Sequence, residues 1–196
     1  SFETLQRKLK ESIQIETFNQ DTLRTLNLYD NGNGFNNAAG LLADKNNFPE
    51  INSFRDCSES QVLNLQSKMS EDVYKRCLFV VKEINRVIKA CEALDSGNIA
   101  VLGQLMYETH EGLSTDYEVS CAELDFLVNS VKKEEVVIGS RLMGGGFGGC
   151  TINLVKKGHE EDIKKRLSKL YFDAFGIELK IYDVKISNGT SLYTAN

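Results

Sequence analysis

The chain has 196 residues, of which 41% are hydrophobic and 26% are charged, and its formal net charge is -5 at pH 7. This length suits one domain with a full core, and the longest apolar runs are far too short to cross a bilayer. The acidic balance leaves no surplus of basic side chains to neutralise a nucleic-acid backbone. We therefore expect a soluble protein that binds neither membrane nor nucleic acid.

The cysteine pattern indicates a reducing compartment. The chain has five cysteines, at positions 57, 77, 91, 121 and 150, and none forms a Cys-x-x-Cys pair. An odd number at wide spacing, with several in apolar-periodic segments, predicts reduced core thiols in a cytoplasmic protein. The sequence opens on Ser1 with no initiator Met and no signal region, so we expect a piece of a longer protein.

Residues 1–52 form the first of two expected regions. Helical spacing predicts an amphipathic helix near the start, with apolar positions at Phe2, Leu5, Leu9 and Ile13. Residues 27–52 are rich in Asn and Gly and contain a strong turn signal at 30–34. We interpret them as an irregular segment with a short helix at 37–43.

Two helices should follow as an antiparallel hairpin. Ser70 offers an N-cap to a long helix that Gly97 ends, and Asn98 can cap the next helix, which extends past Leu113. Alternating spacings of four and three predict one buried stripe on the long helix. Its members are Val73, Cys77, Val80, Ile84, Val87, Cys91 and Leu94.

A third helix has the best-marked start in the chain. Ser120 and Glu123 have the spacing of a capping box. The apolar face that follows consists of Leu124, Leu127, Val128 and Val131, and the helix should stop near the turn at 132–135. The polar side chains at 116–125 therefore have a structural interpretation, with Asp125 as a solvated charge.

The C-terminal third alternates between strands and a helix. Residues 136–142 and 150–154 are typical of strands, the second with one buried face, and residues 163–174 of a helix closed by Gly176. Residues 179–186 predict a third strand. The order favours an α+β fold, a ferredoxin-like α/β sandwich with an antiparallel sheet packed on helices.

The segment between the first two strands carries the densest pattern. Six of the fifteen glycines lie in the twelve residues 139–150. Glycine costs backbone entropy, so the cluster indicates positive φ values or a close approach to a ligand or another backbone. A relaxed hairpin and a loop whose N–H groups face phosphate both explain it.

Other catalytic patterns find little support. His110 and His159 are the only histidines, and neither has partners at metal-ligand spacing, so we expect no metal site. His110, beside Glu108 and Glu111, is interpreted as a surface or capping residue. The chain has neither a Gly-x-Ser-x-Gly elbow nor a Walker-type phosphate loop.

Two blocks of sequence resemble galactokinases, which are GHMP small-molecule kinases. They are Thr109-His-Glu-Gly-Leu-Ser-Thr-Asp-Tyr-Glu-Val-Ser-Cys-Ala-Glu-Leu-Asp125 and Gly139-Ser-Arg-Leu-Met-Gly-Gly-Gly-Phe-Gly-Gly-Cys-Thr-Ile-Asn-Leu-Val155. Ala122 replaces a family proline, and Ser140 and Gly145 replace family alanines. The resemblance covers about residues 53–196 and implies a GHMP kinase C-terminal domain there.

The resemblance also implies what this chain lacks. The family's sugar-seating motif, its Gly/Ser-rich phosphate loop and its catalytic aspartate belong to the N-terminal half, so we expect no catalytic residue here. ATP, Mg²⁺ and galactose would be bound through that half, none of them tightly by this chain alone, which we expect to be inactive. The glycine cluster resembles the third GHMP motif and would form an active-site wall from Gly144, Gly145, Gly146, Phe147, Gly148 and Gly149. Arg141 would orient this wall through carboxylates or phosphate oxygens.

Three hypotheses remain open from the sequence. The first is the C-terminal domain of an enzyme that makes galactose 1-phosphate from galactose and ATP. The second is a non-catalytic relative that senses sugar or contacts a partner protein. The third is a GHMP kinase for a related sugar.

Overall fold

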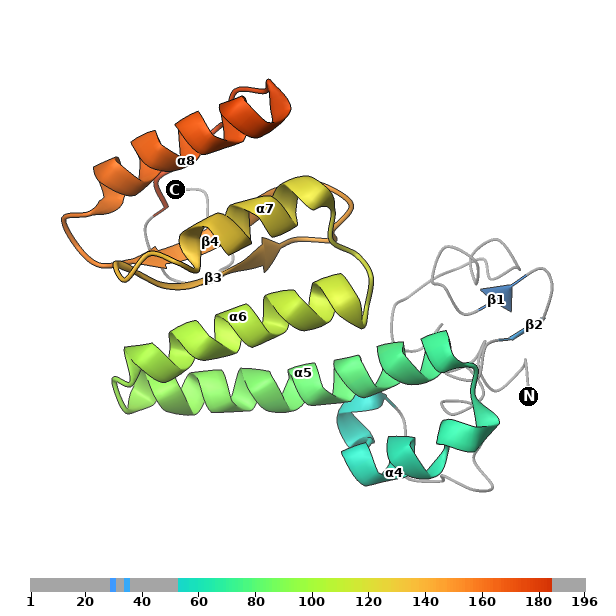
Figure 1. Cartoon of the computed structure of the whole chain (residues 1–196). Helices are drawn as coiled ribbons and strands as arrows, with labels where there is room; N and C mark the ends of the chain where they lie inside the picture. Colours follow the sequence, from blue (N-terminus) through green and yellow to red (C-terminus); the bar gives the residue numbers. More distant parts are fainter. Residues whose placement is uncertain (1–28, 31–33, 36–52, 185–196) are drawn as a thin grey trace, which may run out of the picture.

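The computed structural model describes residues 29–30, 34–35 and 53–184, and Figure 1 shows their arrangement. The helices expected at 2–13 and 37–43 lie outside these residues. Strand β1 (Tyr29–Asp30) pairs antiparallel with β2 (Gly34–Phe35). The interpretation of residues 27–52 as an irregular segment did not include this short strand pair, which lies at the turn signal of residues 30–34.

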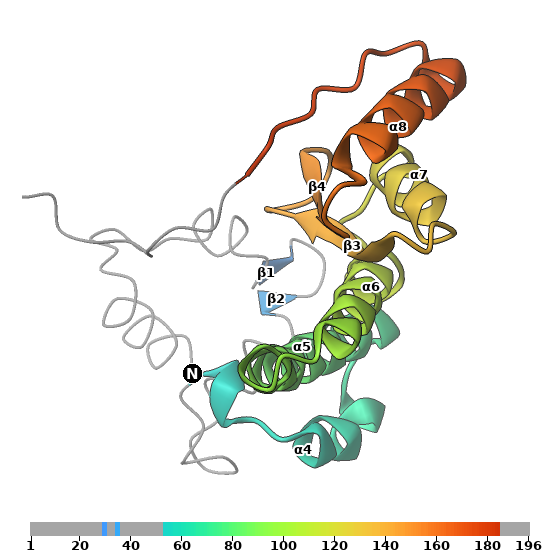
Figure 2. The same cartoon turned by 90° about the vertical axis from the view of Figure 1, so that its left-hand side faces the viewer.

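Helices α5 (Glu71–Asp95) and α6 (Ile99–Thr115) form the expected antiparallel hairpin and lie side by side in Figures 1 and 2. Gly97 turns the chain between them with a φ of 69°, and the Asn98 side chain accepts a hydrogen bond from the Val101 N–H at 3.2 Å. Three short helices, η1 (Phe54–Asp56), α4 (Glu59–Asn64) and η2 (Gln66–Lys68), precede α5. The predicted end of α5 before Gly97 and the predicted start of α6 after Asn98 are therefore both confirmed.

The predicted stripe on α5 is wrong beyond its first half. Cys77 is buried as expected, in a cluster with Val81 and residues of η1 and α4. Val87 and Leu94 are 56% and 54% exposed, and Cys91 is exposed as well. The burial differs because α5 is covered on two sides by different elements, α4 and α6, rather than on one continuous face.

The second layer consists of α7 (Ala122–Val131), β3 (Val137–Met143), β4 (Cys150–Val155) and α8 (Glu160–Phe175). The strands pair antiparallel, with Arg141 opposite Ile152, and residues 144–149 connect them. Figure 2 shows α7 and α8 on the same side of the two strands. The buried residues of this layer's core cluster are Leu127, Val131, Val137, Ile163 and Leu167.

Two glycines let α6 approach the edge of β3. A Cβ atom on Gly103 of α6 would lie 2.0 Å from the carbonyl oxygen of Ile138, and one on Gly139 would lie 2.6 Å from the Cα of Gly103. Real side chains do not tolerate such distances, so both positions need glycine for packing. The two layers therefore meet where helix and strand carry no side chain.

The α+β fold is confirmed, with helices packed on an antiparallel sheet, and two details differ. Residues 177–184 form no strand, and residues 185–186 of the predicted third strand lie outside the described residues. Tyr182 is 75% exposed there, while Leu179 packs against the core cluster, so the segment does not bury one face as a strand would. Strand β4 also lacks a clean alternation, because Cys150 is exposed and its other residues are half-buried.

Candidate functional site

The loop between β3 and β4 has a backbone that only glycine adopts easily. The φ values are 96° at Gly144, 83° at Gly146, 124° at Gly148 and 94° at Gly149. An L-residue with a Cβ is disfavoured at each of these angles. Gly145 has no positive φ and open space around it, so the loop, here called the glycine loop (residues 144–149), needs glycine at four positions.

The glycine loop is anchored to the connection between α6 and α7 by main-chain contact. The Phe147 N–H donates to the carbonyl oxygen of Val119 at 2.7 Å, and a Cβ on Gly146 would lie 2.1 Å from the same oxygen. The amides of the five loop glycines donate no hydrogen bond to another described residue. Unpaired N–H groups without side chains suit an anionic ligand.

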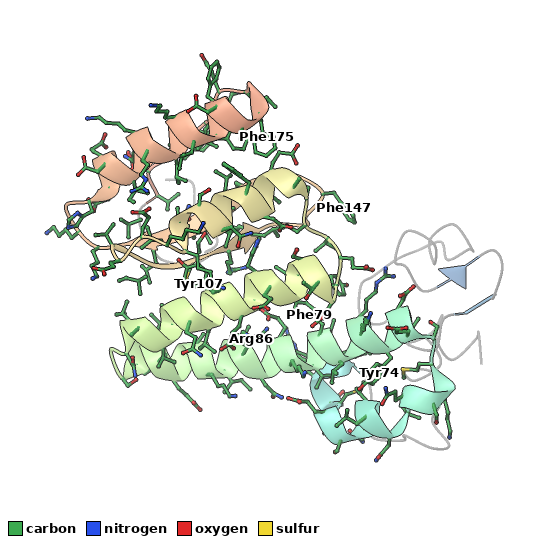
Figure 3. All side chains as sticks on the ribbon, viewed as in Figure 1. Tyr74, Phe79, Arg86, Tyr107, Phe147 and Phe175 are labelled. Atoms are coloured by element: carbon green, nitrogen blue, oxygen red, sulfur yellow. The ribbon has the colours of Figure 1, made fainter. Side chains whose placement is uncertain are left out.

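Backbone strain gathers at this junction. Glu118 and Phe147 are the two non-glycine residues with positive φ within the described ranges, at 57° and 56°. Glu118 lies next to Val119 and forms an ion pair with Arg76 of α5 at 3.2 Å. Phe147 is 79% exposed, and Figure 3 shows it at the end of the sheet near the α6–α7 connection. Strained residues of this kind concentrate at functional sites.

His110 lies inside the protein, so its interpretation as a surface or capping residue is wrong. It is 6% exposed, and its Nδ1 accepts a hydrogen bond from the Leu142 N–H at 3.2 Å. Burial lowers the pKa of His110 below its ordinary value, an effect that Asp125 opposes and Lys132 reinforces. The neutral imidazole therefore links α6 to β3 two residues before the glycine loop.

Asp125 of α7 joins the same network. Its Oδ2 accepts from Ser114 at 2.9 Å, its Oδ1 accepts from Ser120 at 2.5 Å, and Oδ1 lies 3.2 Å from His110 Nε2. The predicted Ser120–Glu123 capping box is absent, because Ser120 donates to Asp125 and α7 begins one residue later with Cys121 at its N-cap. Asp125 is thus a hydrogen-bonded anchor, not a solvated charge.

Arg141 supports the strand that leads into the glycine loop. Its Nη1 donates to the carbonyl oxygen of Leu142 at 3.1 Å, and within residues 53–184 it forms no ion pair. Leu142, which is fully buried, therefore has its N–H bound by His110 and its carbonyl bound by Arg141. The structure places Arg141 next to the predicted wall but shows no contact that tests its predicted partners.

A polar cluster on the other side of α6 was missed by the sequence interpretation. Thr109 donates to Glu83 of α5 at 3.0 Å, and Glu83 pairs with Arg86, which is labelled in Figure 3. Arg86 Nε also lies 3.6 Å from Glu108. Thr109 and His110 are adjacent in sequence, so α6 is tied to α5 by one and to β3 by the other.

One sequence signal pointed to the buried histidine. Gly103 and His110 are seven residues apart on α6, which puts them on one helix face. Gly103 faces Gly139 and His110 faces Leu142, both on β3. The spacing of Gly103 and His110, two turns apart on α6, therefore could have indicated the helix face that packs on β3.

Among the described residues, the glycine loop has groups that suit the phosphates of a nucleotide. The unpaired amides of the glycine loop suit phosphate oxygens. No group of three or more His, Cys, Asp or Glu side chains that could hold a metal ion occurs in the described part of the chain. Among the same residues, no helix combines the length and the apolar character needed to span a membrane.

Comparison with known proteins identifies relatives of this arrangement. Residues 87–173 match the family model "GHMP kinases C terminal". Over 142 residues the chain is 39% identical to a galactokinase of Roseiflexus sp. (strain RS-1), covering 72% of this chain and 36% of the relative. It is 42% identical over 120 residues to a galactokinase of Lactobacillus helveticus, covering 61% of this chain and 31% of the relative.

A solved structure shows the same fold. The crystal structure of Lactococcus lactis galactokinase complexed with galactose matches with a TM-score of 0.63 and 32% sequence identity, covering 66% of this chain and 34% of that chain. The chain thus spans roughly a third of the length of the relatives it matches. The resemblance seen in the sequence is confirmed.

Proposed function

Because residues 87–173 belong to the GHMP kinase C-terminal family and the chain is a homologue of galactokinases, we propose that it supplies the C-terminal part of an enzyme that phosphorylates galactose with ATP. The observation that carries the proposal is the glycine loop, with its positive φ values and with glycine amides that donate to no other described residue. We further propose a cytoplasmic location, which the odd number and wide spacing of the cysteines favour.

The proposed role of the glycine loop is to close one wall of the active-site cleft. ATP supplies the phosphoryl group, and transfer depends mainly on positioning and charge stabilisation. The amides of the five loop glycines would face phosphate oxygens, and the bond from the Phe147 N–H to Val119 would hold the loop in place. Arg141 and His110 would fix the strand from which the loop starts.

The isolated chain should not catalyse the phosphorylation of galactose. The residues that the family uses to hold the phosphates and to take the sugar proton do not occur in this sequence. A chimaera that joins the N-terminal region of Lactococcus lactis galactokinase to this chain should phosphorylate galactose, while the 196-residue chain alone should not. A coupled ADP-release assay measures both proteins under identical conditions.

Each outcome of this experiment decides between functions. Turnover by the isolated chain would contradict the division of labour proposed here. A folded chimaera that binds galactose but releases no ADP would support the non-catalytic sugar sensor instead. The choice between galactose and a related sugar belongs to the N-terminal half, so the upstream sequence of the gene, and not the chimaera, tests the third hypothesis.

A further inference from the structure

A cavity of about 240 Å³ lies between α6 and α7. Its polar wall comes from Tyr107, His110 and Ser114 of α6, from Asp125 and Asn129 of α7, and from Lys132 at the C-cap of α7. In each helix these residues are three or four positions apart, so they occupy one face. Helix faces that meet in a protein are normally apolar, whereas Val128 is the one aliphatic residue in this wall.

Two buried polar atoms at this cavity lack hydrogen-bond partners. Tyr107 Oη and His110 Nε2 are both buried, and neither has an aligned partner among the described residues. His110 Nε2 is 3.2 Å from Asp125 Oδ1, but the alignment does not complete a hydrogen bond. Figure 3 shows Tyr107 in the space between α6 and the layer of α7. Because buried polar atoms are normally paired, these two atoms favour a polar occupant of the cavity, either water or a ligand.

The charges around the cavity disfavour an anion. Its lining has the two carboxylates of Glu111, which is exposed, and Asp125, and one ammonium, that of Lys132, which lies 5.6 Å from the centre of the Tyr107 ring. Asp125 already accepts hydrogen bonds from two serine hydroxyls. The groups that remain are hydroxyl, imidazole N–H and carboxamide, which match a neutral ligand whose hydroxyls both donate and accept.

We propose that the cavity between α6 and α7 is a binding site for a small, neutral, polyhydroxylated molecule between glycerol and a monosaccharide in size. The volume is several times the roughly 30 Å³ that one water occupies in the liquid. It is below the ~300 Å³ at which pockets for drug-sized ligands begin. The bound molecule would offer hydroxyls to Tyr107 Oη and to His110 Nε2, the two atoms without a hydrogen-bond partner among the described residues.

Occupation of this site acts on the glycine loop. The other ring nitrogen of His110 holds the Leu142 N–H, and Asp125 holds Ser120, the neighbour of Val119, to which the loop is bonded. A ligand that fixes the His110 ring therefore restrains both attachments of the loop. This regulatory consequence, unlike binding itself, rests on the proposed function.

The test uses NMR of the whole chain titrated separately with glycerol and with D-galactose. Long-range ¹H–¹⁵N spectra follow His110 Nε2, and amide spectra follow residues 107–115, 125–132 and 144–149. We expect saturable shifts at Nε2 and in both helices with at least one probe. The variant Tyr107→Phe should bind about tenfold more weakly, the usual effect of losing one hydrogen bond. Tyr182→Phe makes the same change at an exposed position outside the cavity and should bind as the wild type.

The remaining outcomes overturn the proposal in whole or in part. Shifts that rise linearly with both probes, or are equal in Tyr107→Phe and the wild type, mean that water alone fills the cavity. Saturable binding that leaves the amides of 144–149 unchanged overturns the link to the loop. None of these readouts depends on turnover, so failure of the chimaera to phosphorylate galactose is a separate result.

Discussion

The N–H of Phe147 and the carbonyl oxygen of Val119, 28 positions apart in the chain, form a 2.7 Å hydrogen bond. Both groups belong to the main chain, so among single substitutions only a proline at position 147 removes one of them directly. The bond depends on Gly146, which lets the two backbones approach. The two sequence blocks that resemble galactokinases are therefore one structural unit.

Gly146→Ala should separate the glycine loop from Val119, and Gly145→Ala should not. At Gly146 an added Cβ meets the Val119 oxygen at 2.1 Å and the φ of 83° disfavours an L-residue, whereas Gly145 has open space and no positive φ. Urea unfolding should show a loss of at least about 1–2 kcal/mol for Gly146→Ala. Gly145→Ala should be neutral or more stable by up to ~1 kcal/mol. Equal stabilities of the two variants would contradict this geometry.

His110 should make stability depend on pH. Burial lowers its pKa in the folded state, so between that pKa and the unfolded value of about 6.5 the unfolded chain binds more protons. The free energy of unfolding should therefore be fully developed above pH 6.5 and fall as the pH decreases through the interval below it. Urea titrations at a series of pH values measure this slope.

The matched variant for this prediction is His110→Asn. Its amide oxygen can take the place of Nδ1 as the acceptor for the Leu142 N–H, but it does not titrate. The pH dependence assigned to His110 should disappear in this variant. A slope that persists unchanged would assign the effect to other groups.

Phe147→Gly should raise stability and lower activity. The φ of 56° strains a residue with a Cβ, and the ring is 79% exposed, so little packing is lost on its removal. Relief of the backbone strain should add up to about 1 kcal/mol to the free energy of unfolding. In the galactokinase chimaera the same change should reduce turnover, measured as ADP release. Phe147→Ala, which removes the ring and keeps the strain, separates the two effects.

The cysteines should react in two groups. Cys77 is buried and its pKa is raised to about 11, mainly by burial, so little thiolate is present at pH 8. Cys91 and Cys150 are exposed, which contradicts their interpretation as core thiols. Alkylation by iodoacetamide followed by mass spectrometry should label Cys91 and Cys150 first. Early labelling of Cys77 in the native protein would show that the α4–α5 core opens readily.

Local patterns predicted the elements whose neighbours lie close in sequence. All four apolar positions of α7, from Leu124 to Val131, are buried as their spacing indicates. The β3–β4 hairpin also follows from two apolar strands joined by a glycine-rich turn. In both cases the partner surface is supplied by the next few elements of the chain, so periodicity identifies the buried face.

Residues that depend on distant partners could not be placed in the same way. The burial of α5 is divided between α4 and α6, so a single stripe through Val87 and Leu94 does not describe it. Ser120 donates its hydroxyl to Asp125, whereas in the predicted capping box the Ser120 oxygen would accept from the backbone N–H of Glu123. The burial of His110 depends on its hydrogen bond with Leu142, 32 positions later in the chain, and no local pattern indicates that partner.

The backbone hydrogen bonds of Leu142 with His110 and Arg141 affect which edge of the sheet can pair with a further strand. The N–H and the carbonyl of Leu142 are bound by side chains, and α6 packs at Gly139, so the outer edge of β3 is covered at these two residues. In the described part of the chain β4 has β3 as its single neighbour. We therefore expect any strand that enlarges this sheet, from elsewhere in the protein or from a partner, to pair with β4.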